Sequence, residues 1–217
     1  MPRAPRIDIP GLIYHVTNRG VKRLPIFYDD DDRQQFLSHL SATLQKFPLR
    51  LHVYCLMTNH YHLLLQTLEG SLSKALHYFN TLFAGWFNRR HDHAGHVFQG
   101  RYHSIPVEED SYFKVVSRYI HLNPVRAQIV HRPEEYAWSN YGRLIRGEPD
   151  SLADTRFLLD YFIGGPAEKR QKYKMFVEDL LGKPEPITEQ VLQRMRFWGK
   201  PPTAYQQKII ALSQKPL

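Results

Sequence analysis

The chain lacks the residues that build disulfide frameworks and membrane spans. Its 217 residues include a single cysteine, Cys55, which excludes an internal disulfide framework and any cysteine-rich zinc site. No apolar run approaches the roughly 18 residues of a membrane helix, and the first eight residues, MPRAPRID, contain no apolar segment of a secretion signal. We therefore expect no membrane association, and a reducing cytoplasm suits the lone cysteine.

Acidic residues are also in short supply. The chain has 21 aspartates and glutamates against 29 lysines and arginines, which gives a formal net charge of +8. Such a surplus favours a polyanionic partner, because each contact with a phosphate releases condensed counterions. The remaining composition, 42% hydrophobic and 23% charged, is that of an ordinary globular protein. A polyanion is therefore the partner that composition favours, although many basic proteins bind no nucleic acid.

A closely spaced histidine pair lies in the segment TNHYHLLL, residues 58–65. Side chains alternate along a strand, so His60 and His62 would share one face about 7 Å apart and could hold one metal ion. The apolar run 51–57 precedes them, and Thr58 and Asn59 suit a hairpin turn. With 12 histidines in the chain, such a pair also arises by chance, and two polar residues at the start of a strand explain it equally well. A second cluster, His91, His93 and His96, lies in a glycine-containing segment that we interpret as a loop.

The segments around this hairpin read as a mixture of strands and helices. Residues 13–18 alternate like a strand, acidic residues 29–32 precede a helix with its apolar face over 36–47, and residues 102–107 form a last strand. A helix that begins near Ser71 or Ser73 carries an aromatic stripe, which we assign to the core and not to base stacking.

A further helix, expected over 112–122, carries Tyr119 with Asn123 four residues later. On a continuous helix these two residues face the same way, with Cβ atoms about 6 Å apart. Two structural alternatives remain open. Asn123 before Pro124 could cap a new helix, and Tyr119 could be a core residue beside Val115 and Val116.

The last third of the chain reads as short helical pieces, expected over 135–146, 152–163, 166–181 and 187–198. Glycine and proline clusters separate them. We divide the chain into a main domain, residues 1–146, and a helical extension of uncertain role, residues 147–217.

Three blocks together resemble a known family: CLMTNHYHLLL, GHVFQGRY and RYIHLNPVRA, in this order. They are similar to the REP-associated tyrosine transposases, which are single-strand transposases of the HUH endonuclease superfamily. The segments YHVTNRG and YAWSNY extend the likeness over roughly residues 6–145. One departure is Tyr61, where the superfamily commonly has a bulky aliphatic residue between the histidines; it would point away from the metal face.

The resemblance implies a ferredoxin-like or RRM-like antiparallel sheet with helices on one face. It also implies that His60, His62 and Asn123 bind a divalent metal and that Tyr119 is the nucleophile. Our candidates for phosphate contacts are Arg19, Arg101 and Arg126, although each could equally be a solvated surface charge.

The implied activity is a metal-dependent nickase and strand transferase that forms a 5′-phosphotyrosine link. Mg²⁺ or Mn²⁺ would serve, and no nucleotide cofactor is needed because the covalent link preserves the phosphodiester energy. The expected substrate is single-stranded or hairpin DNA with palindromic repeats, bound by a monomer or homodimer at the nucleoid in the cytoplasm. The alternative is a catalytically silent nucleic-acid-binding protein with the same fold.

Overall fold

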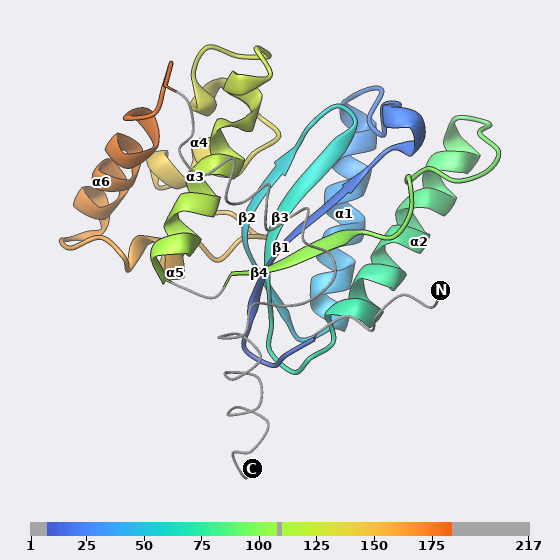
Figure 1. The fold of residues 1–217 in the computed structure, drawn as a ribbon, viewed down its shortest axis with the longest axis horizontal. Coiled ribbons are helices and arrows are strands. Elements are labelled where there is room, and N and C mark those ends of the chain that lie inside the picture. Colours follow the sequence, from blue (N-terminus) through green and yellow to red (C-terminus); the bar gives the residue numbers. More distant parts are fainter. Residues whose placement is uncertain (1–7, 108–109, 184–217) are drawn as a thin grey trace, which may run out of the picture.

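The protein is built on a four-stranded antiparallel sheet with the order β2-β3-β1-β4. The computed structural model describes residues 8–107 and 110–183. The strands are β1 (Ile13–Arg19), β2 (Leu49–Leu56), β3 (His60–Thr67) and β4 (His103–Val107) (Figure 1). Helix α1 (Asp30–Lys46) connects β1 to β2, and α2 (Leu72–Arg90) connects β3 to β4. This order of elements confirms the predicted ferredoxin-like α+β fold.

The hairpin between β2 and β3 sets the position of the histidine pair. The Met57 amide donates to the His60 carbonyl oxygen at 2.9 Å, so Thr58 and Asn59 are the two residues of the loop, as predicted. The register places His60 opposite Arg19 of β1, and His62 opposite Thr17 of β1 and Cys55 of β2. Both histidines therefore belong to the central strand β3, close to the hairpin turn at its start.

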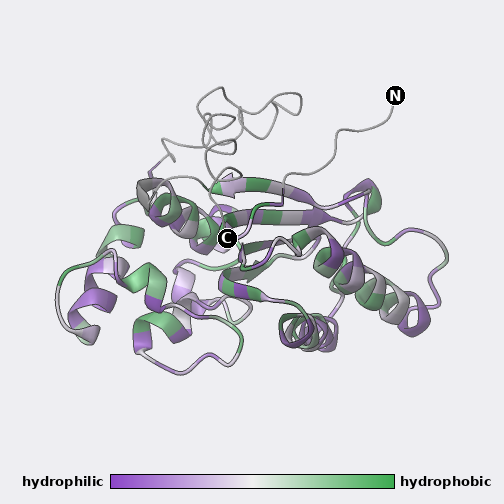
Figure 2. Cartoon of the chain, turned by 90° about the horizontal axis from the view of Figure 1, so that it is seen from below, coloured by the Kyte–Doolittle hydropathy of each residue, from purple (hydrophilic) through white to green (hydrophobic). Residues whose placement is uncertain are grey.

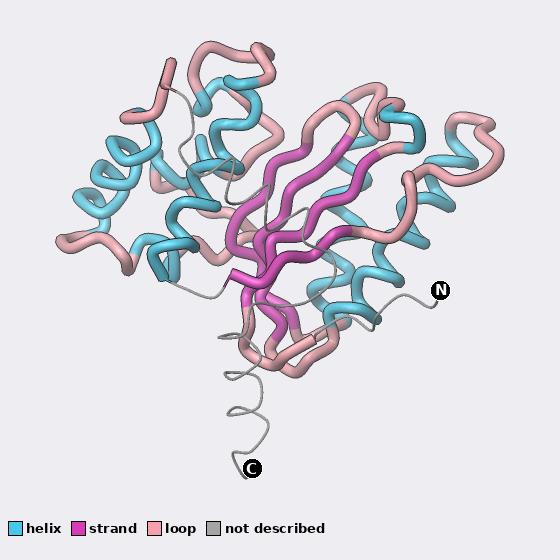
Figure 3. The backbone as a smooth tube through the Cα atoms, in the orientation of Figure 1, coloured by secondary structure: helices cyan, strands magenta, loops and turns pink. Residues whose placement is uncertain are grey.

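One face of the sheet packs on α1 and α2. Strand residues Tyr14, Val16, Tyr61, Leu63 and Leu65 are buried there together with the apolar stripe of α2, and the tube view shows both helices on the same side (Figure 3). The aromatic residues of α2 are thus core residues, as predicted. Tyr61 points away from the two histidines, and its hydroxyl donates to Asn80 Oδ1 at 3.1 Å.

The opposite face is covered by α3 (Asp110–Arg126) and by the helices that follow it. These are α4 (Tyr141–Arg146), α5 (Arg156–Leu159) and α6 (Pro166–Glu178), with short 3-10 turns at Val21–Arg23 and Pro133–Glu135. The second core joins Leu64 and Val53 of the sheet to Val116 and Ile120 of α3. Because both faces are covered, β1, β2 and β3 are buried along most of their length, and hydrophobic and hydrophilic segments are interspersed along the strands and helices in Figure 2.

The helices after residue 133 are shorter than the sequence predicts. The pieces expected over 135–146 and 152–163 reduce to α4 and α5, whereas the piece expected over 166–181 corresponds to α6. The helix expected over 187–198 lies outside the described residues. Tyr173 and Val177 of α6 are buried in the same core as Ile120, so the described part of the extension packs directly on α3.

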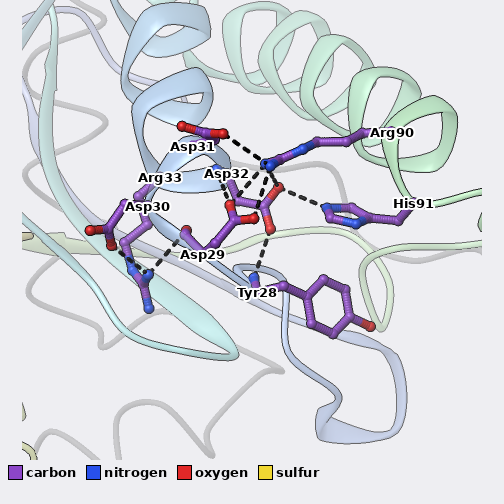
Figure 4. A network of polar contacts seen from close by, with 8 residues as sticks. All are labelled: Tyr28, Asp29, Asp30, Asp31, Asp32, Arg33, Arg90 and His91. Atoms are coloured by element: carbon purple, nitrogen blue, oxygen red, sulfur yellow. Dashed lines mark hydrogen bonds and ion pairs between the residues drawn. The ribbon is translucent and has the colours of Figure 1, made fainter.

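A polar network joins the start of α1 to the end of α2 (Figure 4). Asp29 caps α1 by accepting the Asp32 amide at 3.0 Å. The buried Asp32 carboxylate accepts from Arg90 Nη1 and His91 Nε2, each at 2.7 Å, and from the Tyr28 amide at 2.7 Å. His91, from the second histidine cluster, therefore has a structural partner at the end of α2.

Candidate active site

The histidine pair of β3 faces a tyrosine of α3. The ring centroids of His60 and His62 lie 4.9 Å apart, and the Tyr119 ring stands perpendicular to His62 at a centroid distance of 5.8 Å. Tyr119 is half-buried. The structure thus brings together, within one chain, three of the residues that the sequence singles out.

Each histidine of the pair has its Nδ1 atom engaged by a neighbouring side chain. His60 Nδ1 lies 2.7 Å from Asn59 Oδ1, and His62 Nδ1 lies 2.9 Å from His15 Nε2. His62 Nε2 is buried and has no hydrogen-bond partner among the described residues. Buried polar atoms are nearly always satisfied, and coordination of a metal ion is one way in which a neutral imidazole nitrogen becomes satisfied. This buried nitrogen fits a metal ligand.

Burial keeps these imidazoles in the neutral form. It lowers the pKa of His60 to about 4, with a further contribution from the nearby charge of Arg19. Burial also lowers the pKa of His15 to about 3, and it lowers the pKa of His62 well below the ordinary value, with His60 and His15 adding to the effect. Since metals bind the neutral imidazole, the pair is in its ligating form at neutral pH.

Asn123 lies inside α3, one turn after Tyr119. The helix continues through Pro124 to Arg126, so the alternative in which Asn123 caps a new helix is wrong. Asn123 Nδ2 donates to the Tyr119 carbonyl oxygen at 2.8 Å, a bond that uses the amide nitrogen and not Oδ1. The described contacts include none between Asn123 and the histidine pair, so its role as a ligand stays a prediction.

The described residues contain no group of three or more histidines, cysteines, aspartates or glutamates arranged to hold a metal ion. Although His15 is close, its Nε2 atom is engaged with His62. An ion at His60 and His62 would therefore need oxygen ligands, such as an amide, water or phosphate.

The three candidate arginines lie at different distances from this site. Arg19 stands beside His60 in the sheet and donates to Gln99 Oε1 from Nε at 3.2 Å and Nη2 at 2.9 Å. Arg126 extends over the Tyr119 ring, with Cζ 5.5 Å from the centroid. Arg101 is exposed in the loop that follows Gln99. Because the Gln99 amide also bonds the Arg19 carbonyl oxygen at 2.8 Å, two of the recognised sequence blocks meet here.

His15 belongs to the site, although the sequence does not single it out. Its ring stacks on His62 at 5.2 Å with an interplanar angle of 17°, and it lies edge-on to Tyr119 at 6.2 Å. The residue is in the segment YHVTNRG, where alternation puts it on the same face as Thr17 and Arg19. Only the register between β1 and β3, which pairs Thr17 with His62, reveals that His15 lies diagonally across from that histidine.

No described helix is long and apolar enough to cross a membrane.

Comparisons with known proteins agree with the arrangement of the sheet, although no curated protein matches the chain. A solved structure titled as a REP-associated tyrosine transposase bound to a REP hairpin superposes with a TM-score of 0.58 at 16% identity, covering 71% of this chain and 93% of that one; at this identity the likeness shows the fold. The model of the IS200-like transposases matches residues 8–123, more than half of the chain, and the protein therefore belongs to that family.

Proposed function

We propose that the protein is a metal-dependent endonuclease and strand transferase for single-stranded or hairpin DNA, with Tyr119 as its nucleophile. The observation that carries this proposal is the neutral imidazole pair, one of whose buried nitrogens has no described partner, facing a tyrosine ring at 5.8 Å. A protein that only binds DNA needs no such convergence of strand and helix residues.

The residues available to hold Mg²⁺ or Mn²⁺ are His60 and His62 through Nε2, and Asn123 through Oδ1. When bound, the ion would neutralise charge on the scissile phosphate and fix the direction of attack. Imidazole ligands tilt the intrinsic affinity toward Mn²⁺. Asn123 reaches this role only through its oxygen, since its amide nitrogen is bonded to the Tyr119 carbonyl.

Tyr119 would act by transesterification. Its Oη atom forms a bond to phosphorus while the bond from phosphorus to the 3′ oxygen breaks, which leaves a 5′-phosphotyrosine link and a free 3′-hydroxyl. The phenolic proton is lost to solvent, and the departing 3′ oxygen gains a proton from solvent. Attack of a 3′-hydroxyl on the same link reverses the step and joins strands without a nucleotide cofactor.

The basic surroundings of the site suit a DNA backbone. Arg19 and Arg126 lie beside His60 and Tyr119 respectively, and the exposed Arg101 extends the positive charge. The solved structural neighbour is bound to a REP hairpin; for this chain we propose DNA with palindromic repeats, which would place the protein on the nucleoid. We propose a monomer or a homodimer, and the closeness of the His62 and Tyr119 rings within one chain supports the monomer.

The test is incubation of the protein with labelled hairpin DNA and Mn²⁺, followed by denaturing electrophoresis. We expect a covalent protein–DNA adduct that disappears with a chelator and in Tyr119→Phe. Tyr112→Phe is the matched control, because it removes a hydroxyl from the same helix two turns earlier, and it should retain the adduct. An adduct that survives in Tyr119→Phe would reject the nucleophile. Hairpin binding by the wild-type protein with no adduct would favour the silent binding protein.

A further inference from the structure

We propose that Asn59 and His15 are positioning residues that fix the tautomers of His60 and His62, so that both Nε2 atoms present lone pairs to a divalent cation. This inference rests on the metal site of the proposed function. It concerns which nitrogen of each ring carries the proton, a choice that decides whether a neutral histidine can bind a metal at all.

Asn59 fixes His60 without ambiguity. Its Nδ2 atom donates to the Arg23 carbonyl oxygen at 2.9 Å, so the amide oxygen must be the atom that faces His60 Nδ1 at 2.7 Å. An amide oxygen can only accept a hydrogen bond. His60 must therefore carry its proton on Nδ1, and its Nε2 atom is left with a lone pair.

His15 fixes His62 in a conditional way, because two neutral imidazoles can share one hydrogen bond in either direction. If His15 Nε2 donated to His62 Nδ1, His62 would carry its proton on Nε2, which is buried without a described partner. An unsatisfied buried N–H group is rarer than an unsatisfied acceptor. The arrangement therefore favours His62 as donor from Nδ1 and His15 as acceptor at Nε2, which leaves the lone pair of His62 on Nε2.

The two ligands consequently differ in how firmly they are prepared. The tautomer of His60 is fixed by the Asn59 amide oxygen, which can only accept a hydrogen bond. The Asn59 amide nitrogen donates to the turn at Val21–Arg23, where Lys22 and Arg23 adopt positive φ angles of 52° and 65°. His62 depends on an imidazole that could reverse the bond. Outer partners of metal-bound histidines typically contribute about 10- to 100-fold in metal affinity, and we expect His15 to fall in that range.

Metal binding tests His15 directly. Mn²⁺ titrations followed by electron paramagnetic resonance should give a dissociation constant about 10- to 100-fold weaker for His15→Phe, which retains a ring that can stack but removes the acceptor. His15→Gln places an amide oxygen near the former Nε2 position and should restore most of the affinity. Both variants should be compared at a temperature where circular dichroism shows them folded. Equal affinity of His15→Phe and wild type, or loss of affinity in both folded variants, would overturn the role of His15.

Nitrogen NMR of the metal-free protein tests the tautomers independently of any metal. Long-range ¹H–¹⁵N correlations distinguish a proton on Nδ1 from one on Nε2, and the signals are assigned with His60→Ala and His62→Ala. We expect both histidines as Nδ1–H forms, and Asn59→Ala should shift His60 toward the Nε2–H form while Asn59→Asp, which keeps the acceptor, should not. An Nε2–H form of His62 in the wild type, or an unchanged His60 in Asn59→Ala, would refute the inference.

These experiments separate the two proposals. If the wild-type protein binds no Mn²⁺, the metal site of the proposed function fails, and the positioning of ligands fails with it. If the wild type binds Mn²⁺ and His15→Phe binds it equally well, only the positioning role is wrong.

Discussion

Lowering the pH should lower the free energy of unfolding through the buried histidine His121, which lies two residues after the proposed nucleophile. His121 is buried between Tyr173 of α6 and Asn140, which precedes α4. Its Nδ1 atom lies 2.6 Å from the Tyr173 hydroxyl and its Nε2 atom 3.0 Å from Asn140 Oδ1. Since Asn140 Oδ1 also accepts the Tyr54 amide at 3.0 Å, His121 must donate from Nε2. In the neutral ring, which burial favours, Nδ1 is then the acceptor for the Tyr173 hydroxyl.

The pKa of His121 sets the size and the direction of the effect. Burial lowers this pKa to about 4, against the opposing effect of the bond to Asn140, whereas an unfolded histidine titrates near 6.5. Between these values the unfolded chain binds more protons than the folded one, so the free energy of unfolding falls as the pH falls. By linkage, His121 alone should account for a loss of about 2 kcal/mol between pH 7 and pH 5.

The assay compares wild type with His121→Gln in thermal and urea unfolding at pH 7 and pH 5. The variant loses the acceptor of the Tyr173 hydroxyl and should be destabilised at pH 7 by about 1–3 kcal/mol. The further loss at pH 5 should be smaller in the variant than in wild type by about 2 kcal/mol, or roughly 4–8 °C in Tm for a chain of this size. Burial also lowers the pKa of His15, His52 and His60, but their contributions are common to both proteins and cancel in the comparison.

The reasoning is refuted if wild type and His121→Gln lose the same stability between pH 7 and pH 5. A variant that matches the wild type at pH 7 would show in addition that the bond to Tyr173 contributes nothing. Tyr173→Phe measures the contribution of this bond separately, because it removes the hydroxyl that donates to His121 Nδ1 and leaves His121 titratable. Tyr28→Phe is the control for removal of a tyrosine hydroxyl, since Tyr28 is 58% exposed.

Two further predictions concern charge. Asp32→Ala should lower the free energy of unfolding by about 2–4 kcal/mol in urea titrations, because Arg90 and His91 lose a buried acceptor. The control Asp31→Ala, at a side chain 73% exposed, should change it by less than about 0.5 kcal/mol. Equal effects of the two substitutions would contradict a stabilising role for the buried Asp32 carboxylate. Arg101→Ala should weaken binding of a labelled hairpin about equally across sequences and make the slope of log K against log salt shallower by about one, as measured by fluorescence anisotropy; an unchanged slope would remove Arg101 from the DNA contacts.

The sequence predicts the sheet and its hairpin well because their signals are local. Alternation, turn residues and acidic residues before a helix act over a few positions, and the loop at Thr58 and Asn59 follows from them. The placement of Tyr61 away from His60 and His62 follows from the period of two residues alone. The ends of the short helices after residue 133 are less predictable, since their lengths depend on packing against α3.

Contacts that depend on register could not be predicted. His15 reaches His62 because β1 pairs with β3 in one alignment among several, and a shift of one residue would turn His15 to the opposite face. Asn123 posed a different difficulty. A residue before proline usually leaves the helical region, yet α3 continues through Pro124. The side chain of Asn123 donates to the Tyr119 carbonyl, the acceptor one turn back, and so adds a local bond just ahead of a residue that has no N–H group.

The position of Tyr119 over the histidines depends on residues far along the chain. The neighbouring Arg118 lies over the Phe176 ring, with Cζ 4.2 Å from the centroid, and donates to the Phe176 carbonyl oxygen at 3.4 Å. Together with the bond between His121 and Tyr173, this contact fastens the outer side of α3 to α6 while Val116 and Ile120 pack toward the sheet. Helix α3 therefore packs between the sheet and α6, and this packing fixes the position of Tyr119 next to the histidine pair of its own chain.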